Sequence, residues 1–122
     1  MTADDFRRIA LGLDGAIESA HMGHPDFRVN GRIFATLRAD QSTGMVKVSP
    51  AEQAALVRDY ARTFMPSSGA WGRAGCTDVR LETAAIATVR GALILAWTAA
   101  TSRPPATRRA KRAAPARNRR GR

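Results

Sequence analysis

Apolar side chains in the first hundred residues recur at helical spacing near both ends and at strand spacing between them. The first apolar stripe predicts a helix that takes Thr2 as its N-cap and ends at Gly12 or Gly15. Asp4 and Asp5 fall in the first turn, where the helix dipole favours negative charge. The face that we expect this helix to bury consists of Phe6, Ile9, Ala10 and Leu13.

Alternation of period two follows in the next segment and predicts strands. A short extended stretch is expected around Ala16 to Ala20, and a hairpin joins Phe27–Val29 to Arg32–Arg38. Asn30-Gly31 lies between them, and this pair accepts the positive φ angles of a type I′ turn. In that register Val29 faces Arg32 and Phe27 faces Phe34. Both faces of the hairpin are partly apolar, so alternation does not decide which one meets the helices.

A second helix is predicted most firmly by its start. A strand from Met45 to Ser49 leads into a capping box, with Ser49 as N-cap, Pro50 at the first helical position and Glu52 three residues after the cap. The helix is expected to end near Ala61 or Thr63. It should bury some of Ala54, Leu56, Val57 and Tyr60.

The rest of the domain is predicted as a hairpin and a helix. After a loop at Ser67–Ala70, residues Trp71 to Gly75 should begin the second hairpin, and Asp78 to Leu81 should close it. A helix follows from about Thr83 to Ala100, with a buried stripe of Ile86, Val89, Leu93, Ala96 and Trp97. This last stretch approaches the length of a membrane span, but it is mostly Ala and Thr with a central arginine, so we expect no membrane partner. The prediction is an α+β domain of two layers, with about five antiparallel strands and three helices in the order α-β3-α-β2-α.

Charge divides the chain into two parts. The 122 residues carry a formal net charge of +10, but residues 1–101 hold all ten acidic residues against eleven basic ones, a net charge of +1. Residues 102–122 contain no acid and are rich in Ala and Pro, a composition typical of a disordered arm. We therefore predict a domain at 1–101 and a disordered tail at 102–122. The basic residues of that tail are Arg103, Arg108, Arg109, Lys111, Arg112, Arg117, Arg119, Arg120 and Arg122.

Catalytic and metal chemistry find little support in the residues. The phosphate-binding glycine loops and the GxSxG nucleophile motif do not occur. His21, His24 and Asp26 could supply metal ligands, but they lie in a Gly/Pro loop without the helical spacing of zinc sites, so we expect no metal and no cofactor. Cys76 has no base nearby in sequence and is expected to be a buried or rim thiol. A single cysteine and no secretory leader predict a cytoplasmic protein. The lack of a recognisable catalytic motif predicts that it is not an enzyme.

Several separated motifs resemble the MmcQ/YjbR family. The run His24-Pro25-Asp26-Phe27-Arg28-Val29-Asn30-Gly31-Arg32-Ile33-Phe34-Ala35-Thr36-Leu37 is similar to its signature hairpin. Asp5-Phe6-Arg7, Gly44-Met45-Val46-Lys47, Trp71-Gly72-Arg73, Asp78-Val79-Arg80-Leu81 and Ala96-Trp97 follow the family order. The resemblance implies a small α+β fold with its helices on one face of an antiparallel sheet. It also implies a DNA-binding role through two β-hairpin wings, a double wing, and it supplies no catalytic residues to carry over to this chain.

Basic residues of the wings and of the tail could carry out this DNA binding. The wings offer cations and one amide to phosphate oxygens, and such contacts position a protein without reading sequence. The tail should supply most of the affinity, and its charge fits DNA and RNA equally well; with the double wing we expect DNA more than RNA, in a nucleoid-associated setting. Trp71 is either a base-stacking side chain or a core or rim residue. The candidate wing residues are Arg28, Asn30, Arg32, Lys47, Arg73 and Arg80.

A protein-interaction module is the alternative reading. The family topology resembles that of small secretion chaperones, which bind polypeptide or dimerise through a sheet, and the mixed apolar faces of the first hairpin would allow such contacts. A homodimer is therefore a further expected assembly. Fold alone does not decide between the two functions.

Overall fold

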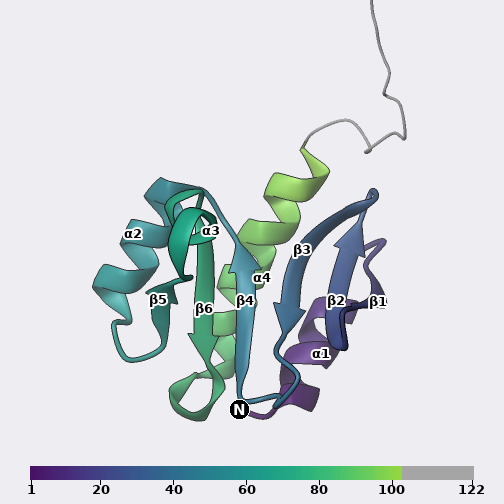
Figure 1. Ribbon diagram of the computed structural model, residues 1–122, viewed down its shortest axis with the longest axis horizontal. Coiled ribbons are helices and arrows are strands. Elements are labelled where there is room, and N and C mark those ends of the chain that lie inside the picture. The colour runs from purple at the N-terminus through teal and green to yellow at the C-terminus, as the bar shows by residue number, and fades with distance from the viewer. Residues whose placement is uncertain (103–122) are drawn as a thin grey trace, which may run out of the picture.

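The computed structural model of the chain describes residues 1–102. Within them, six strands form one antiparallel sheet in the order β1-β2-β3-β4-β6-β5 (Figure 1). The expected disorder of the tail concerns residues that, apart from Ser102, lie outside the described part. The elements are α1 (Ala3–Leu11), β1 (Ile17–His21), β2 (His24–Val29), β3 (Arg32–Leu37), β4 (Thr43–Lys47), α2 (Pro50–Asp59), β5 (Phe64–Pro66), α3 (Gly69–Arg73), β6 (Cys76–Arg80), a 3₁₀ turn (Leu81–Thr83) and α4 (Ile86–Thr101).

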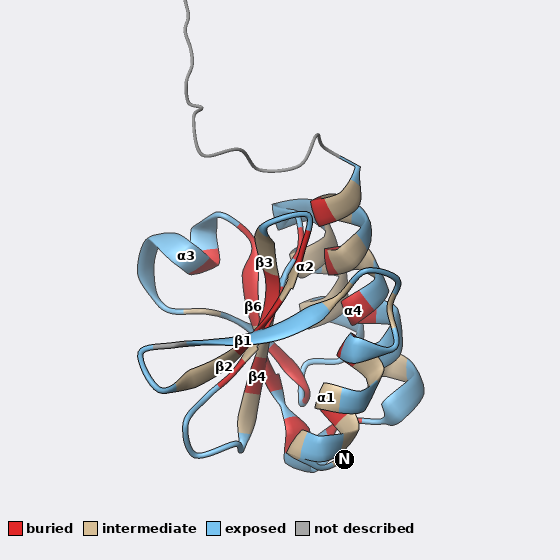
Figure 2. Cartoon of the chain, turned by 90° about the vertical axis from the view of Figure 1, so that its right-hand side faces the viewer, coloured by how far each residue is buried: buried red, intermediate tan, exposed pale blue. Residues whose placement is uncertain are grey.

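The predicted α+β class is confirmed, with one more strand and one more short helix than expected. Four strands precede α2, because the extended stretch before the first hairpin pairs with it as β1. The α1 and α4 helices pack on one face of the sheet, and α2 lies beside β5 and β6 with Leu56 and Val57 against the core. Figure 2 shows α3 on the other side of the sheet, so the expectation of all helices on one face is wrong for α3.

Two of the three predicted helix starts, those of α1 and α2, are confirmed by their hydrogen bonds. The hydroxyl of Thr2 accepts from the backbone N–H of Asp5 at 3.1 Å, and the carboxylate of Asp5 accepts from the N–H of Thr2 at 2.9 Å. Ser49 and Glu52 make the same reciprocal pair at 3.0 and 2.9 Å. These bonds satisfy N–H groups that a helix start leaves without partners. Helix α2 ends at Asp59, a little earlier than predicted.

The first hairpin turns at Asn30 and Gly31 with φ angles of 55° and 78°, as predicted. Its register is different beyond the first two pairs. Phe27 lies opposite Ala35 instead of Phe34, because an extra residue is inserted in β3 between the partners of Phe27 and Arg28. This β-bulge turns Phe34 and Ala35 both into the core, which simple alternation cannot do.

The predicted strand at Trp71–Gly75 is wrong. The strand of the second hairpin is β5, which pairs with β6, and the intervening residues form the five-residue helix α3. The N–H of Ser67 donates to the carbonyl of Cys76 at 2.9 Å and closes the connection at its base. Residues that the sequence assigns to a loop and to the start of a hairpin strand instead make a short helix.

The last helix begins at Ile86, after the 3₁₀ turn at Leu81–Thr83, instead of at Thr83. Val89, Leu93 and Ala96 are buried as predicted, whereas Ile86 is 45% exposed. Trp97 is half-buried, and its indole N–H donates to the carbonyl of Asp14 at 2.8 Å. No helix within residues 1–102 is long and apolar enough to cross a membrane.

Candidate functional site

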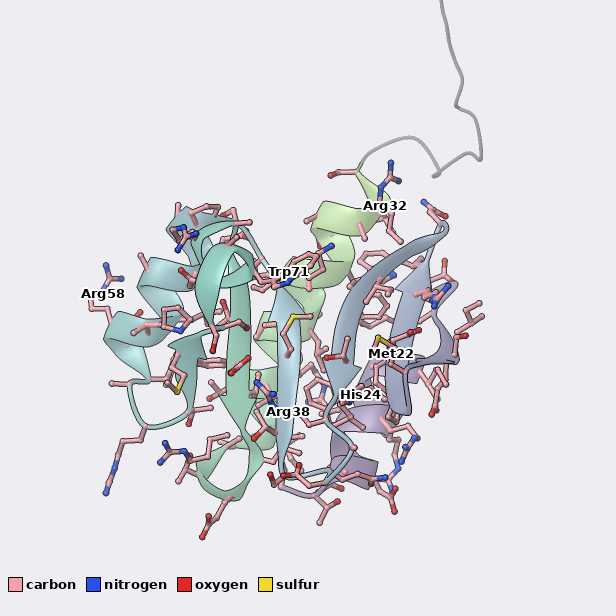
Figure 3. The ribbon with its side chains drawn as sticks, in the orientation of Figure 1. Met22, His24, Arg32, Arg38, Arg58 and Trp71 are labelled. Atoms are coloured by element: carbon pink, nitrogen blue, oxygen red, sulfur yellow. The ribbon has the colours of Figure 1, made fainter. Side chains whose placement is uncertain are left out.

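The face of the sheet turned away from α1 and α4, here called the open face, contains a hollow of about 520 Å³. Its side chains come from alternate positions of β2, β3, β4 and β6, with α3 at one end. Figure 3 looks onto this face, with His24 and Arg38 below and Trp71 above. The lining consists of His24, Asp26, Ile33, Thr36, Arg38, Met45, Lys47, Ser67, Ser68, Trp71, Cys76 and Asp78, besides the core residue Leu37.

Two carboxylates of the open face are neutralised by arginines. Asp26, whose side chain is 1% exposed, accepts two hydrogen bonds from Arg28, Nε at 2.8 Å and Nη2 at 3.1 Å. This hydrogen bonding raises the pKa of the Arg28 guanidinium. Asp78 accepts from the hydroxyl of Ser67 at 2.6 Å and from Arg38 at 3.0 Å. The hollow therefore does not present free negative charge to a ligand.

Three predicted cations of the domain are exposed and have no ion-pair partner among the described residues: Lys47, Arg73 and Arg80. Lys47 lies opposite Cys76 at one end of the β4–β6 pair, and Arg80 lies opposite Thr43 at the other. Arg73 ends α3, at the same end of the sheet as Lys47. Arg73 and Arg80 thus flank β6 at opposite ends and cannot contact one site together.

The first wing offers less free charge than its sequence indicates. Arg28 is held by Asp26, and Asn30 is exposed but occupies the turn position that its positive φ requires. Arg32 is half-buried directly after the turn, and Figure 3 shows it near the tip. The role of these residues in binding stays a prediction.

The end of the sheet that carries both hairpin tips is also where α4 ends. Figure 1 shows the β2–β3 turn, α3 and the C-terminal end of α4 at this end. The basic run predicted as the main binding element follows α4 in the sequence. Its nine basic residues lie outside the described part of the chain.

The candidate catalytic and metal-binding residues lie in surroundings that do not favour either role. Cys76 is 5% exposed, and burial raises the pKa of its thiol, an effect that Lys47 partly opposes and Asp78 reinforces. His24 and Asp26 both line the hollow, but Asp26 is already engaged by Arg28. Among the side chains that the structure describes, no three His, Cys, Asp or Glu gather closely enough to hold a metal ion.

Sequence reasoning missed the middle of the open face. Thr36, Met45 and Asp78 form a row across the sheet with Asp26, because Thr36 pairs with Asp26 and Met45 pairs with both Thr36 and Asp78. The alternation of residues along each strand indicated which of them share a face within that strand. The row could not be assembled without the bulge in β3 and the order β3-β4-β6, neither of which the sequence shows.

The fold and the open face define a class: small α+β domains in which helices cover one face of an antiparallel sheet and a pair of hairpins flanks a central strand. The chain belongs to the YjbR family, whose sequence model matches residues 11–98. The expected resemblance is thereby confirmed. A similar fold occurs in the crystal structure of the Deinococcus radiodurans protein DR2400, of domain DUF419, with a TM-score of 0.68. The match covers 82% of this chain and 78% of that one at 19% identity. None of the curated proteins matches the chain.

Proposed function

We propose that the protein binds nucleic acid, DNA in the first place, with the basic run after Ser102 supplying most of the affinity. The observation that carries this proposal is the division of charge. Nine of the twenty basic residues and none of the ten acidic ones follow Ser102, whereas the described domain has a net charge of only +1. Such a run neutralises phosphates and releases their counterions, a driving force that needs no defined sequence.

The domain orients the protein on the nucleic acid and supplies a smaller share of the positive charge that contacts phosphates. Lys47 and Arg73 are exposed without ion-pair partners in the described residues, at the end of the sheet where α4 leads into the basic run. Phosphate contacts from both would hold the hairpin end against the nucleic acid. Because these are backbone contacts, the binding is sequence-tolerant.

The test is duplex DNA binding by fluorescence anisotropy across a salt series, always with the full chain. In one variant all nine basic residues after Ser102 are replaced by glutamine. Nine phosphate contacts would give a slope of log K against log salt of about −8, and two contacts a slope of about −2. We expect the glutamine variant to lose most of both affinity and slope.

A matched pair of variants tests the domain's share. Lys47→Gln with Arg73→Gln removes two charges from the hairpin end, and Arg62→Gln with Arg90→Gln removes two exposed charges elsewhere. The first pair should weaken binding more than the second, but less than the loss of the nine basic residues. A wild-type chain that does not bind duplex DNA at low salt would overturn the proposal.

A protein-contact function is the second candidate, because a separate apolar hollow of about 290 Å³ lies between α1 and α4. Ile86 and Ile94 line it and are each more than 40% exposed. Sedimentation velocity decides whether this surface joins two copies of the chain. A dimer that Ile86→Ser with Ile94→Ser converts to monomer would support it, and a wild-type monomer at high concentration would exclude it.

A further inference from the structure

We infer that the hollow on the open face takes an unpaired base of a single-stranded nucleic acid, which stacks on Trp71 while Lys47 contacts an adjoining phosphate. This inference rests on the proposed function and narrows it to a substrate class. Trp71, Lys47 and the floor residues line one hollow.

Trp71 has no evident structural task. Its side chain is 70% exposed, and among the described residues its indole makes no hydrogen bond and no ring contact. Trp97 shows what a structural tryptophan does in the same molecule: it is half-buried, and its indole N–H donates to Asp14. Exposing the apolar surface of an indole to water is unfavourable in free energy. A ligand that covers this surface would gain that free energy on binding.

The backbone beneath Trp71 is firmly held. Gly72 approaches Ser67 so closely that any Cβ would overlap its carbonyl, and Gly75, at a φ of 114°, approaches the carbonyl of Val48 in the same way. The amide of Gln53, on α2, donates to the carbonyls of Gly72 and Cys76, both at 2.9 Å. These contacts clamp α3 to the rest of the domain. The indole is thus presented from a fixed position, which lowers the entropic cost of binding.

The hollow beside Trp71 fits a base in shape and chemistry. Figure 3 shows Trp71 extending from α3 over the end of β4, and the half-buried side chains of Ile33 and Met45 provide apolar surface on the sheet below. Thr36 and Ser68 add hydrogen-bonding groups, and Lys47 adds a cation. The volume of about 520 Å³ lies within the range of small-ligand sites.

Duplex bases cannot reach such a site, because they are stacked and paired inside the helix. Single strands expose base faces, and proteins bind them with aromatic side chains beside a cationic path for the backbone. The arginine-neutralised carboxylates Asp26 and Asp78 leave that path free of net negative charge. The open face therefore favours single strands over duplex, whereas the basic run accepts both.

The test compares two fluorescently labelled probes of equal charge on the full chain: a 12-nucleotide oligothymidine and an abasic strand of the same length. Stacking of one base predicts that the oligothymidine binds at least about fivefold more tightly, since one stacked base contributes about 1–3 kcal/mol. Trp71→Ala should abolish this difference without changing affinity for the abasic strand, and Trp71→Phe should keep most of it. Ile17→Ala, which truncates an exposed apolar residue of β1 outside the hollow, is the matched control and should leave the difference unchanged.

Each outcome has one meaning. Equal binding of both probes by the unaltered chain overturns the inference and leaves the charge-driven proposed function standing; this comparison needs no variant. The inference is also overturned if Trp71→Ala, with an unchanged melting temperature, keeps the difference between the two probes as Ile17→Ala does, which would happen if the hollow bound a peptide. Failure of the unaltered chain to bind duplex DNA at low salt would overturn the proposed function itself.

Discussion

The two faces of the sheet are built from the same strands, but one forms the core and the other faces solvent. Toward α1 and α4, alternate residues supply a dry core in which Phe6, Phe27, Phe34 and Phe64 are almost completely buried. Toward solvent, the residues between them are ionic, hydroxylic or only half-buried, and Trp71 lies above them. Strand geometry makes this division possible because successive side chains point to opposite faces. Binding and stability can therefore be altered separately, apart from the ion pair of Asp26 and Arg28.

The largest contrast between the faces should come from aromatic truncation. Phe34→Ala removes a fully buried ring and should lower the free energy of unfolding by about 3–5 kcal/mol. Trp71→Ala removes an exposed ring and should change it by less than about 0.5 kcal/mol. Urea denaturation followed by circular dichroism measures both. If both variants lost a similar free energy of unfolding, Trp71 and α3 would be part of the core.

The ion pair of Asp26 and Arg28 should be the exception on the open face. Arg28→Ala leaves the buried carboxylate without its two hydrogen bonds, whereas Lys47→Ala removes an exposed cation that makes no hydrogen bond or ion pair of its side chain within the described residues. We expect the urea midpoint to fall clearly for Arg28→Ala and to stay unchanged for Lys47→Ala. Arg28→Ala with an unchanged midpoint would show that the carboxylate is reached by water.

A smaller effect is expected where the sheet passes into α2. Ser49→Ala deletes the hydroxyl that accepts from the N–H of Glu52 at 3.0 Å. Loss of an N-cap should lower the free energy of unfolding by about 1 kcal/mol, and the open face should not change. Thermal unfolding gives the loss, and Ser49→Thr should restore most of it. An oligonucleotide affinity that changes with Ser49→Ala would contradict the separation of the two functions.

The smallest effect is the acid sensitivity contributed by α1. The N–H of Thr2 and the guanidinium of Arg8 hold the pKa of Asp5 below its ordinary value of 3.8. The native state thus binds its proton less readily than the unfolded chain, so this contribution is complete above pH 3.8 and is lost as pH falls below it. Asp5→Asn should therefore lose less stability than wild type between pH 6 and pH 3. Equal losses, measured by urea titration at both pH values, would show that the capping carboxylate is not the source.

Local chemistry could be predicted where neighbours in sequence decide the outcome. The Thr2 N-cap, the Ser49–Glu52 capping box and the Asn30-Gly31 turn depend on residues within three positions of one another, and the structure confirms all three predictions. The short helix α3 was not, because its stability depends on Gln53 and on close packing of Gly72 against Ser67. Contacts of this kind leave no periodic signal in the sequence.

The candidate site shows the same division. Lys47 and Arg73 were predicted and lie at the end of the sheet that carries the hairpin tips. Arg80, assigned to the same wing as Arg73, lies at the other end of β6, and Arg28 is occupied by Asp26. Residue type identified the cations, but strand direction and ion pairing decided which of them are available.

The sequence by itself determined the α+β class, the family, the starts of α1 and α2 and the concentration of positive charge after Ser102, because each depends on composition, spacing or neighbouring residues. Only the tertiary structure decided which face of the sheet stays open and which side chains line it. The bulge at Phe34 changes which residues of β3 face the core, and the order β4-β6-β5 places α3 over the open face. These features come from pairing and packing between residues distant in the chain, which a local pattern does not encode.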